Sequence, residues 1–337
     1  MFDLIYITNL PSFYKINLFN EIAKHRKILV VFTHNYSIQR NADFYIGKKE
    51  FAYISIADKS RLGKIFFILK LLKKTSYQQI IIGGWDQLVF WAAAYFSPRS
   101  RNGVIVESSI FESNTNGFNG LIKKLFFSRI SRAYVSGKSQ VDLCIALGFK
   151  GIKIVTKGVG IFNIRPQPHY ITRTKVKYFI YVGRLSKEKN LQFLIETFNK
   201  LPELVLNIIG FGPQELFLKS ISMQNIVFHG AIPNSELYKQ YQKNDVFVLP
   251  SISEPWGMVV EEAFNSGLPV IVSDKVGCAE EIVTISNGIV FKLSDPSGLR
   301  NALLKVQKID YYNSLRLSIS KMDFKKITEN QINCYLH

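Results

Sequence analysis

The 337-residue sequence has few cysteines, no long hydrophobic run and fewer acidic than basic residues. Its three cysteines, Cys144, Cys278 and Cys334, lie far apart, which fits neither a disulfide framework nor a metal-binding pair. Charged or polar residues interrupt every apolar stretch before it reaches the roughly 18 to 20 residues of a membrane-spanning helix. We therefore expect no transmembrane segment. The N-terminal residues also have no basic start and no small-residue cleavage site, so a cytoplasmic protein is the expectation.

Motifs that would define several other chemistries are missing as well. No Asp-x-Asp pair offers a simple metal site, and the five histidines show no metal-ligand spacing. No G-x-S-x-G elbow supports a serine hydrolase. No third spaced glycine follows Gly210 and Gly212, which argues against the nucleotide site of a dehydrogenase. We expect neither a metal ion nor another cofactor.

The basic residues are concentrated in the first half of the chain. Residues 1–169 contain 24 Lys and Arg against 9 Asp and Glu, about +15, whereas residues 170–337 contain 19 against 16, about +3. A positive field of this kind attracts nucleic acid, an anionic membrane or an anionic acceptor without distinguishing among them. The charge therefore indicates a polyanionic partner for the first half but does not choose it.

Short β-branched and aromatic runs alternate with helix-period segments along the chain. The alternation predicts an α/β fold of two domains, each with a mostly parallel sheet covered on both faces. The stretch 158–177 contains two prolines and few aliphatic residues, and it predicts an interdomain linker. The expected strands cover residues 4–7, 28–32, 80–82, 104–106, 133–136 and 152–156, then 178–182, 205–209, 226–229, 246–249, 270–273 and 288–291.

The most informative stretch is residues 246–283, which read as strand, loop, helix, strand, turn and helix. Ligands of an open parallel sheet bind beyond the carboxyl ends of its strands, and the loop 250–257 lies at such an end. Gly257 permits close backbone approach, and the helix after it offers free N–H groups to a phosphate. Glu254 lies in the loop and Glu262 about one and a half turns into the helix. Either could be an ordinary solvated acid, but the apolar residues around them predict a buried element whose charges need a function.

At these residues the sequence resembles glycosyltransferase family 4, the retaining group 1 transferases of the GT-B fold, whose signature is a Glu, seven residues and a second Glu. Glu254 and Glu262 have that spacing. The resemblance extends to YVGRLSKEKN at 181–190, IIGFGP at 208–213, FHGAIP at 228–233 and GLPVIVSD at 267–274. It covers nearly all of the second domain. In the first domain it covers only the general layout and the opening LPSFYKINLFNEI.

This resemblance implies two Rossmann-like domains that face each other across a cleft. It implies an acceptor-binding domain over residues 1–165, a nucleotide-sugar-binding domain over 170–315, and a segment 316–337 whose helix, expected over 317–336, packs back on the first domain. The implied reaction is metal-independent, retaining transfer from a nucleotide sugar to a hydroxyl of a glycan or lipid-linked glycan, as in bacterial polysaccharide, O-antigen and lipopolysaccharide biosynthesis. The nucleotide sugar is then a substrate and not a cofactor.

The resemblance also implies roles for single residues of the second domain. Glu262 would hold the nucleotide ribose through its hydroxyls, and Glu254 would lie beside the donor sugar. Arg184 and Lys189 resemble the family's basic pair, which stabilises the departing diphosphate in place of a metal ion. The remaining candidates for donor binding are Gly183, Gly210, Gly212, Trp256, Gly257 and Met258. A solvated turn stays the alternative for the basic motif, and a packing role stays the alternative for Trp256.

The first domain departs from the family pattern where many relatives carry a histidine in the donor-sugar pocket, because Glu107 stands there instead. Glu107 is a candidate catalytic residue that could accept hydrogen bonds from a sugar, or it could be a capping or salt-bridging acid. The family's glycine-rich opening loop is replaced by residues 9–14. The candidates for acceptor binding are Pro11, Tyr14, Gly84 and Trp85. A tight turn with a helix cap is the alternative for Gly84 and Trp85.

Two segments of the first domain, 61–74 and 121–132, combine apolar residues with Lys and Arg. With the uneven charge they favour docking to an anionic surface, on the inner face of the cell membrane, where a lipid-linked acceptor would lie. Either segment alone could be a core helix with lysines on its wet face. Two other functions stay open: a sugar-nucleotide epimerase or phosphorylase, and a degenerate GT-B protein that binds lipid or nucleic acid. No nucleic-acid-binding motif supports the latter.

Overall fold

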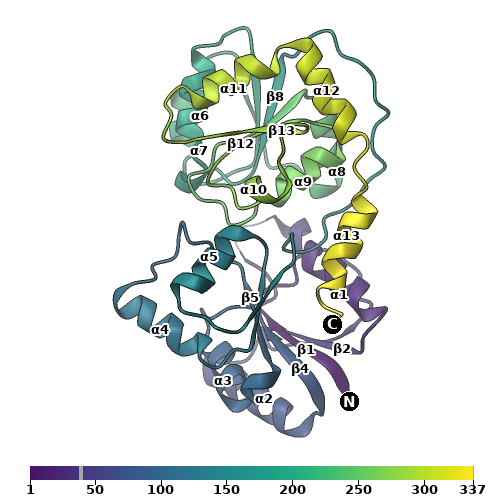
Figure 1. The fold of residues 1–337 in the computed structure, drawn as a ribbon, viewed down its shortest axis with the longest axis vertical. Helices are drawn as coiled ribbons and strands as arrows, with labels where there is room; N and C mark the ends of the chain where they lie inside the picture. The colour runs from purple at the N-terminus through teal and green to yellow at the C-terminus, as the bar shows by residue number, and fades with distance from the viewer. Residues whose placement is uncertain (38–40, 337) are drawn as a thin grey trace. The chain divides into compact units, whose positions relative to one another are not determined.

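The computed structural model describes residues 1–37 and 41–336, which form two compact units. The first unit consists of residues 1–161 together with the segment that begins at Lys326, and the second consists of residues 162–325. The order of helices and strands along the chain can be followed in Figure 1. Within the described residues, no helix combines the length and the apolar character that crossing a membrane would require.

The first unit contains a seven-stranded sheet in the order β3-β2-β1-β4-β5-β6-β7, and all neighbouring strands pair in parallel. Its strands are β1 (Phe2–Thr8), β2 (Ile28–Phe32), β3 (Ala52–Ser55), β4 (Tyr77–Ile82), β5 (Asn102–Val106), β6 (Arg132–Val135) and β7 (Ile152–Val155). Its helices are α1 (Phe13–Ala23), α2 (Arg61–Lys74), α3 (Leu88–Phe96), α4 (Gly117–Phe127), α5 (Lys138–Ala146) and most of α13 (Phe324–Asn333).

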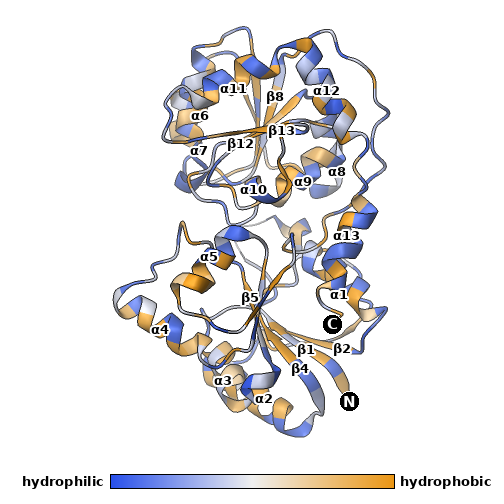
Figure 2. Cartoon of the chain, in the orientation of Figure 1, coloured by the Kyte–Doolittle hydropathy of each residue, from blue (hydrophilic) through white to orange (hydrophobic). Residues whose placement is uncertain are grey.

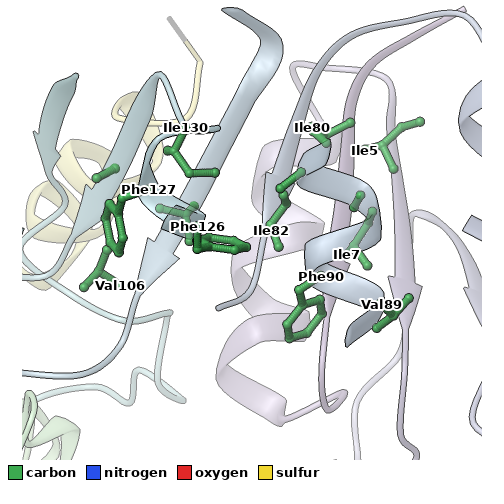
Figure 3. Close-up of a cluster of buried hydrophobic side chains, with 14 of the residues drawn as sticks. Ile5, Ile7, Ile80, Ile82, Val89, Phe90, Val106, Phe126, Phe127 and Ile130 are labelled. Atoms are coloured by element: carbon green, nitrogen blue, oxygen red, sulfur yellow. The ribbon is translucent and has the colours of Figure 1, made fainter. Parts of the chain in front are cut away.

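Side chains of β1 point alternately to the two faces of this sheet, as the geometry of a strand requires. Ile5 and Ile7 belong to one buried cluster, and Leu4 and Tyr6 belong to a second. Figure 3 shows Ile5 and Ile7 beside Ile80 and Ile82 of β4 in the first of these clusters. Because both faces are buried, the central strands are mainly apolar, and Figure 2 shows hydrophobic colour along much of their length.

The second unit contains a six-stranded parallel sheet in the order β10-β9-β8-β11-β12-β13. Its strands are β8 (Tyr178–Val182), β9 (Val205–Ile209), β10 (Ile226–Gly230), β11 (Val246–Leu249), β12 (Val270–Ser273) and β13 (Gly288–Phe291). Its helices are α6 (Leu191–Asn199), α7 (Glu215–Ser220), α8 (Asn234–Gln242), α9 (Met258–Asn265), α10 (Ala279–Ile282), α11 (Gly298–Val306) and α12 (Ile309–Ile319). The chain order reverses between β8 and β11, as it does between β1 and β4 in the first unit.

The strands expected from the sequence all form, and residues 158–177 contain neither a helix nor a strand. The short strand β3 was not expected. It lies at the edge of the sheet and is largely exposed. Its sequence therefore lacks the alternation of apolar and polar residues that predicts a half-buried strand.

The single helix expected over residues 317–336 is wrong, because α12 ends at Ile319 and α13 begins at Phe324. Leu315 and Ile319 of α12 are buried, and the hydroxyl of Tyr312 donates a hydrogen bond to the carbonyl of Asp245 in the second unit. Tyr335, in contrast, belongs to the core of the first unit. One straight helix cannot pack into two separate cores. The helical conformation is therefore interrupted between α12 and α13.

Candidate active site

The chain reversal in the second sheet brings three loops to one carboxyl edge. The strands β8 and β11 pair in parallel, and β9 pairs with the other side of β8. The loops that follow them contain residues 183–190, 210–214 and 250–257, so every donor-site candidate before α9 lies in one of these loops. Ligands of open α/β sheets bind at this kind of reversal.

The loops after β8 and β9 are locked together by glycine. Gly210 has a φ of 135°, and a Cβ there would lie 1.9 Å from the carbonyl oxygen of Gly183. The backbone N–H of Leu185 donates to the carbonyl of Phe211 at 2.9 Å, and a Cβ at Gly212 would lie 2.5 Å from the carbonyl oxygen of Leu185. Gly183, Gly210 and Gly212 therefore allow the close backbone packing of the two loops at this edge.

The loop after β11 is tied to the basic motif and carries a pair of opposite charges. The N–H of Ile252 donates to the carbonyl of Glu188 at 2.9 Å, and the Asn190 amide donates to the carbonyl of Pro250 at 3.2 Å. The ammonium group of Lys189 forms an ion pair with Glu254, and the two side chains are only 16% and 15% exposed. Two of the predicted residues, 65 positions apart, are thus in direct contact.

A turn after β12 supports Glu254 from the other side. The N–H of Gly277 donates a hydrogen bond of 2.8 Å to the carbonyl of Glu254. The N–H of Cys278 donates one of 2.9 Å to the carbonyl of Trp256. A Cβ at Gly277 would lie 1.8 Å from the carbonyl oxygen of Pro255. The sequence analysis did not select Gly277, although its position just past a strand at the carboxyl edge is a signal that could have identified it.

Helix α9 begins directly after the loop. Gly257, the residue before its first turn, has a φ of 96°, a conformation that side chains rarely adopt. The helix then starts at Met258, so the backbone of residues 257 and 258 lies at the positive end of the helix dipole. This arrangement fits the predicted contact with a diphosphate but does not require one.

Glu262 lies in α9 and is half-buried. One of its carboxylate oxygens accepts a hydrogen bond of 3.1 Å from the hydroxyl of Tyr241 on α8. Burial raises the pKa of Glu262 to about 7, while the hydrogen bond from Tyr241 opposes the shift. The carboxyl group is therefore held in a defined orientation and changes charge near neutral pH.

Glu261, the neighbour of Glu262 in sequence, is a buried acid that the sequence analysis did not select as a site residue. It is 7% exposed and accepts a hydrogen bond of 2.8 Å from the indole N–H of Trp256. Burial raises its pKa to about 8, the indole opposes the shift and Glu262 adds to it. The side chain of Trp256 is itself buried, which gives it the packing role that was the alternative for this residue.

Arg184 lies at the end of β8 within a small polar network. Its guanidinium group contacts a carboxylate oxygen of Glu188 at 2.6 Å, and the hydroxyl of Ser186 donates to the same oxygen at 2.6 Å. Burial would raise the pKa of Glu188, but the bonds from Ser186, from its own backbone and from Arg184 outweigh burial and lower it. Glu188 therefore stays ionised and holds Arg184 in place.

The candidates of the first unit lie near the carboxyl edge of their own sheet. Glu107 forms an ion pair of 2.7 Å with Lys15, which was one of the alternatives for this residue. Pro11 is buried, and the ring of Tyr14 packs edge-on against Phe13.

Gly84 and Trp85 follow β4 at the same edge. Gly84 has a φ of 150°. The ring of Trp85 packs against Phe127 with centroids 5.5 Å apart, and its carbonyl accepts a hydrogen bond from the indole of Trp91. Among the residues that the structure describes, no group of three His, Cys, Asp or Glu is arranged to hold a metal ion.

Comparison with known proteins agrees with this arrangement. A family model described as glycosyl transferases group 1 matches residues 167–321. The chain is 36% identical over 143 residues to the sulfoquinovosyl transferase SQD2 of Arabidopsis thaliana, covering 42% of this chain and 28% of that protein. It is 30% identical over 231 residues to the O-antigen biosynthesis glycosyltransferase WbnH of Escherichia coli, covering 64% of each. The chain thus spans less than two thirds of these relatives.

A solved structure of HepE from Anabaena in complex with UDP-glucose has a TM-score of 0.71 to this chain at 14% identity, covering 100% of this chain and 99% of that one. At this identity the similarity concerns the fold, which is GT-B with two Rossmann-like sheets. The matched residues 167–321 contain the loops around Arg184, Lys189, Glu254 and Glu262, and over this stretch the chain is similar to the group 1 glycosyl transferases.

Proposed function

We propose that this protein transfers a sugar, with retention and without a metal cofactor, from a nucleotide sugar to a hydroxyl of a glycan or lipid-linked glycan at the cytoplasmic face of a membrane. One observation carries the proposal. The loops after β8 and β11 bring Lys189 and Glu254 into contact at the reversal of a parallel sheet, with Glu262 on the helix that follows. A solvated surface turn would not bury this pair.

Each residue has a task in that reaction. Ionised Glu262 accepts hydrogen bonds from the ribose hydroxyls, and the backbone of Gly257 and Met258 donates to the diphosphate. When the bond between the sugar and the diphosphate breaks, Arg184 and Lys189 stabilise the negative charge on the leaving group. Before this bond breaks, Glu254 orients the donor sugar. A uridine diphosphate sugar is the first donor to test, because the similar HepE structure contains UDP-glucose.

The acceptor is assigned to the first unit. The acceptor candidates Pro11, Tyr14, Gly84 and Trp85 lie near the carboxyl edge of its sheet, together with the catalytic candidate Glu107, and open α/β sheets bind ligands at this edge. The acceptor hydroxyl loses its proton as its oxygen bonds to the anomeric carbon, and the proton leaves with the diphosphate. A glycan acceptor agrees with the similarity to WbnH, which is described as an O-antigen biosynthesis glycosyltransferase.

A membrane surface is proposed as the place of reaction because of helix α4. Phe118, Leu121, Ile122 and Leu125 recur at spacings of three and four residues, so they form one stripe, and each is between 37% and 76% exposed. Such a stripe costs free energy in water and gains it in a bilayer. Figure 2 shows the hydrophobic residues along α4. The helix carries Lys123 and Lys124 and no acidic residue.

Thermal unfolding tests the donor assignment. The wild type, Glu262→Gln, Arg184→Ala and the control Glu196→Gln are unfolded with UDP-, GDP-, ADP-, CMP- and dTDP-linked sugars. We expect one nucleotide class to raise the melting temperature of the wild type and of the control, because a ligand of the folded state stabilises it. Glu196 is exposed on α6 and does not belong to the site. Both site variants should lose the shift.

Other outcomes separate the competing functions. Stabilisation of the wild type by anionic vesicles but by no nucleotide sugar would replace the transferase with a lipid-binding GT-B protein. Turnover of a nucleotide sugar or glycan with inorganic phosphate and no second sugar would indicate a phosphorylase. Product analysis by NMR then decides whether the anomeric configuration is retained.

A further inference from the structure

The first unit contains a buried lysine that the proposed transfer has not yet used. Lys15 lies in the first turn of α1 and is 7% exposed. Its ammonium nitrogen lies 2.7 Å from a Glu107 oxygen, 3.0 Å from the Asn9 amide oxygen and 3.4 Å from the Thr8 hydroxyl. Burial would lower the pKa of Lys15, but Glu107 outweighs it and raises the pKa, so the lysine keeps its charge. Three elements, β1, α1 and β5, converge on this one ammonium group.

The ion pair is asymmetric in a way that suits binding. Lys15 is buried and its ammonium group contacts other groups of the protein, whereas the Glu107 side chain is 40% exposed. Lys15 contacts Oε1 of Glu107, and within the described residues Oε2 accepts no hydrogen bond. A carboxylate that is fixed through one oxygen and open at the other can accept a hydrogen bond from a ligand.

Lys15 and Glu107 line a small pocket with two further polar groups. Tyr6 and Ser136 also line it, both residues are at least 97% buried, and neither hydroxyl has a hydrogen-bond partner within the described residues. Buried hydroxyls without partners are costly and rare in proteins, and they require water or a ligand. We call this site the Lys15 pocket.

The chemistry of the Lys15 pocket favours a neutral ligand rich in hydroxyls. An anion would meet the Glu107 carboxylate and a cation would meet the Lys15 ammonium, whereas the paired charges cancel for a neutral group. Hydroxyls both donate and accept, which matches the unpaired hydroxyls of Tyr6 and Ser136. Tyr134 and Tyr335, whose rings stack on each other, also line the pocket and add apolar surface to its lining.

We infer that the Lys15 pocket binds a neutral hydroxyl-bearing group of a carbohydrate, that Oε2 of Glu107 accepts a hydrogen bond from it, and that Lys15 is a positioning residue that fixes Glu107. This inference rests on the proposed function, because the carbohydrate is assigned as the acceptor. It adds three residues, Lys15, Tyr6 and Ser136, to the candidates of the first unit.

Saturation-transfer NMR on the full chain tests the pocket with four probes: the methyl glycosides of glucose, galactose, mannose and N-acetylglucosamine. We expect at least one to bind the wild type. Tyr6→Phe and Ser136→Ala each remove one unpaired hydroxyl, and each should lower the affinity for that glycoside roughly tenfold. Ser128→Ala, an exposed serine outside the pocket, is the control and should bind as the wild type does. Absence of binding to the wild type, or equal binding by both pocket variants, overturns the inference and leaves ordered water as the occupant.

Two lysine variants test the positioning role. Lys15→Met should lower the affinity for the glycoside at least as much as Tyr6→Phe does. Lys15→Arg, which keeps the charge, should bind the glycoside more tightly than Lys15→Met. Equal loss in both variants would contradict positioning by charge. If Lys15→Met does not fold, the two hydroxyl variants still decide the question, because they leave the ion pair intact.

Stabilisation by UDP is measured on the same samples. It should persist in the variants of the Lys15 pocket, because the donor candidates lie in the other unit. Loss of glycoside binding with UDP stabilisation intact supports the inference. Glycoside binding to a wild type that no nucleotide stabilises supports the pocket while contradicting the proposed transferase, so the two failures can be told apart.

Discussion

Glu261 and Glu262 are adjacent carboxyl groups whose pKa values burial raises to about 8 and about 7. In the unfolded chain they lose their protons near pH 4.5. Between these values the folded state binds more protons than the unfolded state does. The contribution to stability is therefore largest at low pH, declines as the pH rises from about 4.5 to about 8, and is constant above that range.

The first residue-scale prediction concerns Glu261→Gln, which keeps an oxygen for the Trp256 indole but cannot ionise. We expect the free energy of unfolding to fall less between pH 5 and pH 9 than in the wild type, by on the order of 2 kcal/mol. Urea unfolding at several pH values measures this. Glu196→Gln, on the exposed face of α6, should retain the wild-type dependence. An unchanged pH dependence in Glu261→Gln would show that Glu261 does not titrate as inferred.

The second residue-scale prediction concerns the pH dependence of donor binding. In the proposed function Glu262 accepts hydrogen bonds from ribose, which it does best when ionised, and its pKa is raised to about 7. The affinity for UDP should therefore increase several-fold from about pH 6 to about pH 8. Glu262→Gln should bind more weakly and show a flatter profile in titration calorimetry. A profile equally steep in the variant would assign the titration to another group.

The third residue-scale prediction concerns the ion pair of Lys189 and Glu254. Lys189→Met leaves a largely buried carboxylate without its cation and should cost about 1 to 3 kcal/mol of stability. Adding Glu254→Gln to it should recover part of the loss, because the uncompensated charge is then gone. Urea unfolding of the two single variants and the double variant measures the coupling. Strictly additive losses would mean that the two groups do not interact in solution.

At the scale of elements, α2 and α4 look alike in sequence but differ in packing. In α2, Ile68 and Leu72 are buried and Phe67 and Leu71 pack against the same core cluster, while Leu62 and Phe66 are exposed. In α4, only Gly120, Phe126 and Phe127 are buried, so its apolar stripe faces water. Because the four exposed apolar residues of α4 form one stripe, we take α4 as the better candidate for membrane contact.

The element-scale prediction follows from this difference. Leu121→Glu with Leu125→Glu should weaken binding to vesicles of phosphatidylcholine and phosphatidylglycerol at least tenfold, since each removes a side chain whose burial contributes about 1.5 to 3 kcal/mol. Vesicle flotation measures the bound fraction. Ile285→Glu, which changes an equally apolar and more exposed residue of the second unit, should have no effect. Equal loss in the control would point to general charge repulsion, and binding retained by the α4 variant would exclude α4.

At the scale of the whole molecule, charge is uneven although the two units have similar sheets. The formal net charge is +18, and residues 1–169 contribute about +15 of it. Two copies of such a chain repel each other, while an anionic surface attracts it. The long-range attraction therefore belongs to the half of the chain that carries α4.

The whole-molecule prediction is a strong salt dependence of vesicle binding. Raising the ionic strength from about 0.05 M to about 0.5 M shortens the screening length several-fold and should release most of the protein from anionic vesicles. Neutral phosphatidylcholine vesicles should bind little at either salt concentration. Binding that is insensitive to salt would mean that the apolar stripe of α4 acts without the charge.

The sequence alone determined the local structure and the spacing of the candidate site residues. Strands such as β8 and β11 are short apolar runs between turn residues, and helices such as α2 follow the helical period, so near neighbours in sequence decide them. The spacing of Glu254 and Glu262 and the glycines around Gly210 were visible for the same reason. The sequence also showed the uneven charge, which is a property of composition.

Only the tertiary structure decided which polar groups are buried and which groups they contact. Glu261 and Glu262 are neighbours in sequence, yet one bonds Trp256 and the other Tyr241 on a different helix. Lys15 forms an ion pair with Glu107, which lies 92 residues later in the sequence. The order of the strands in the sheet brings the two residues together, and no local sequence pattern predicts that order. Burial and contact depend on how distant segments pack, and local propensity carries no information about that packing.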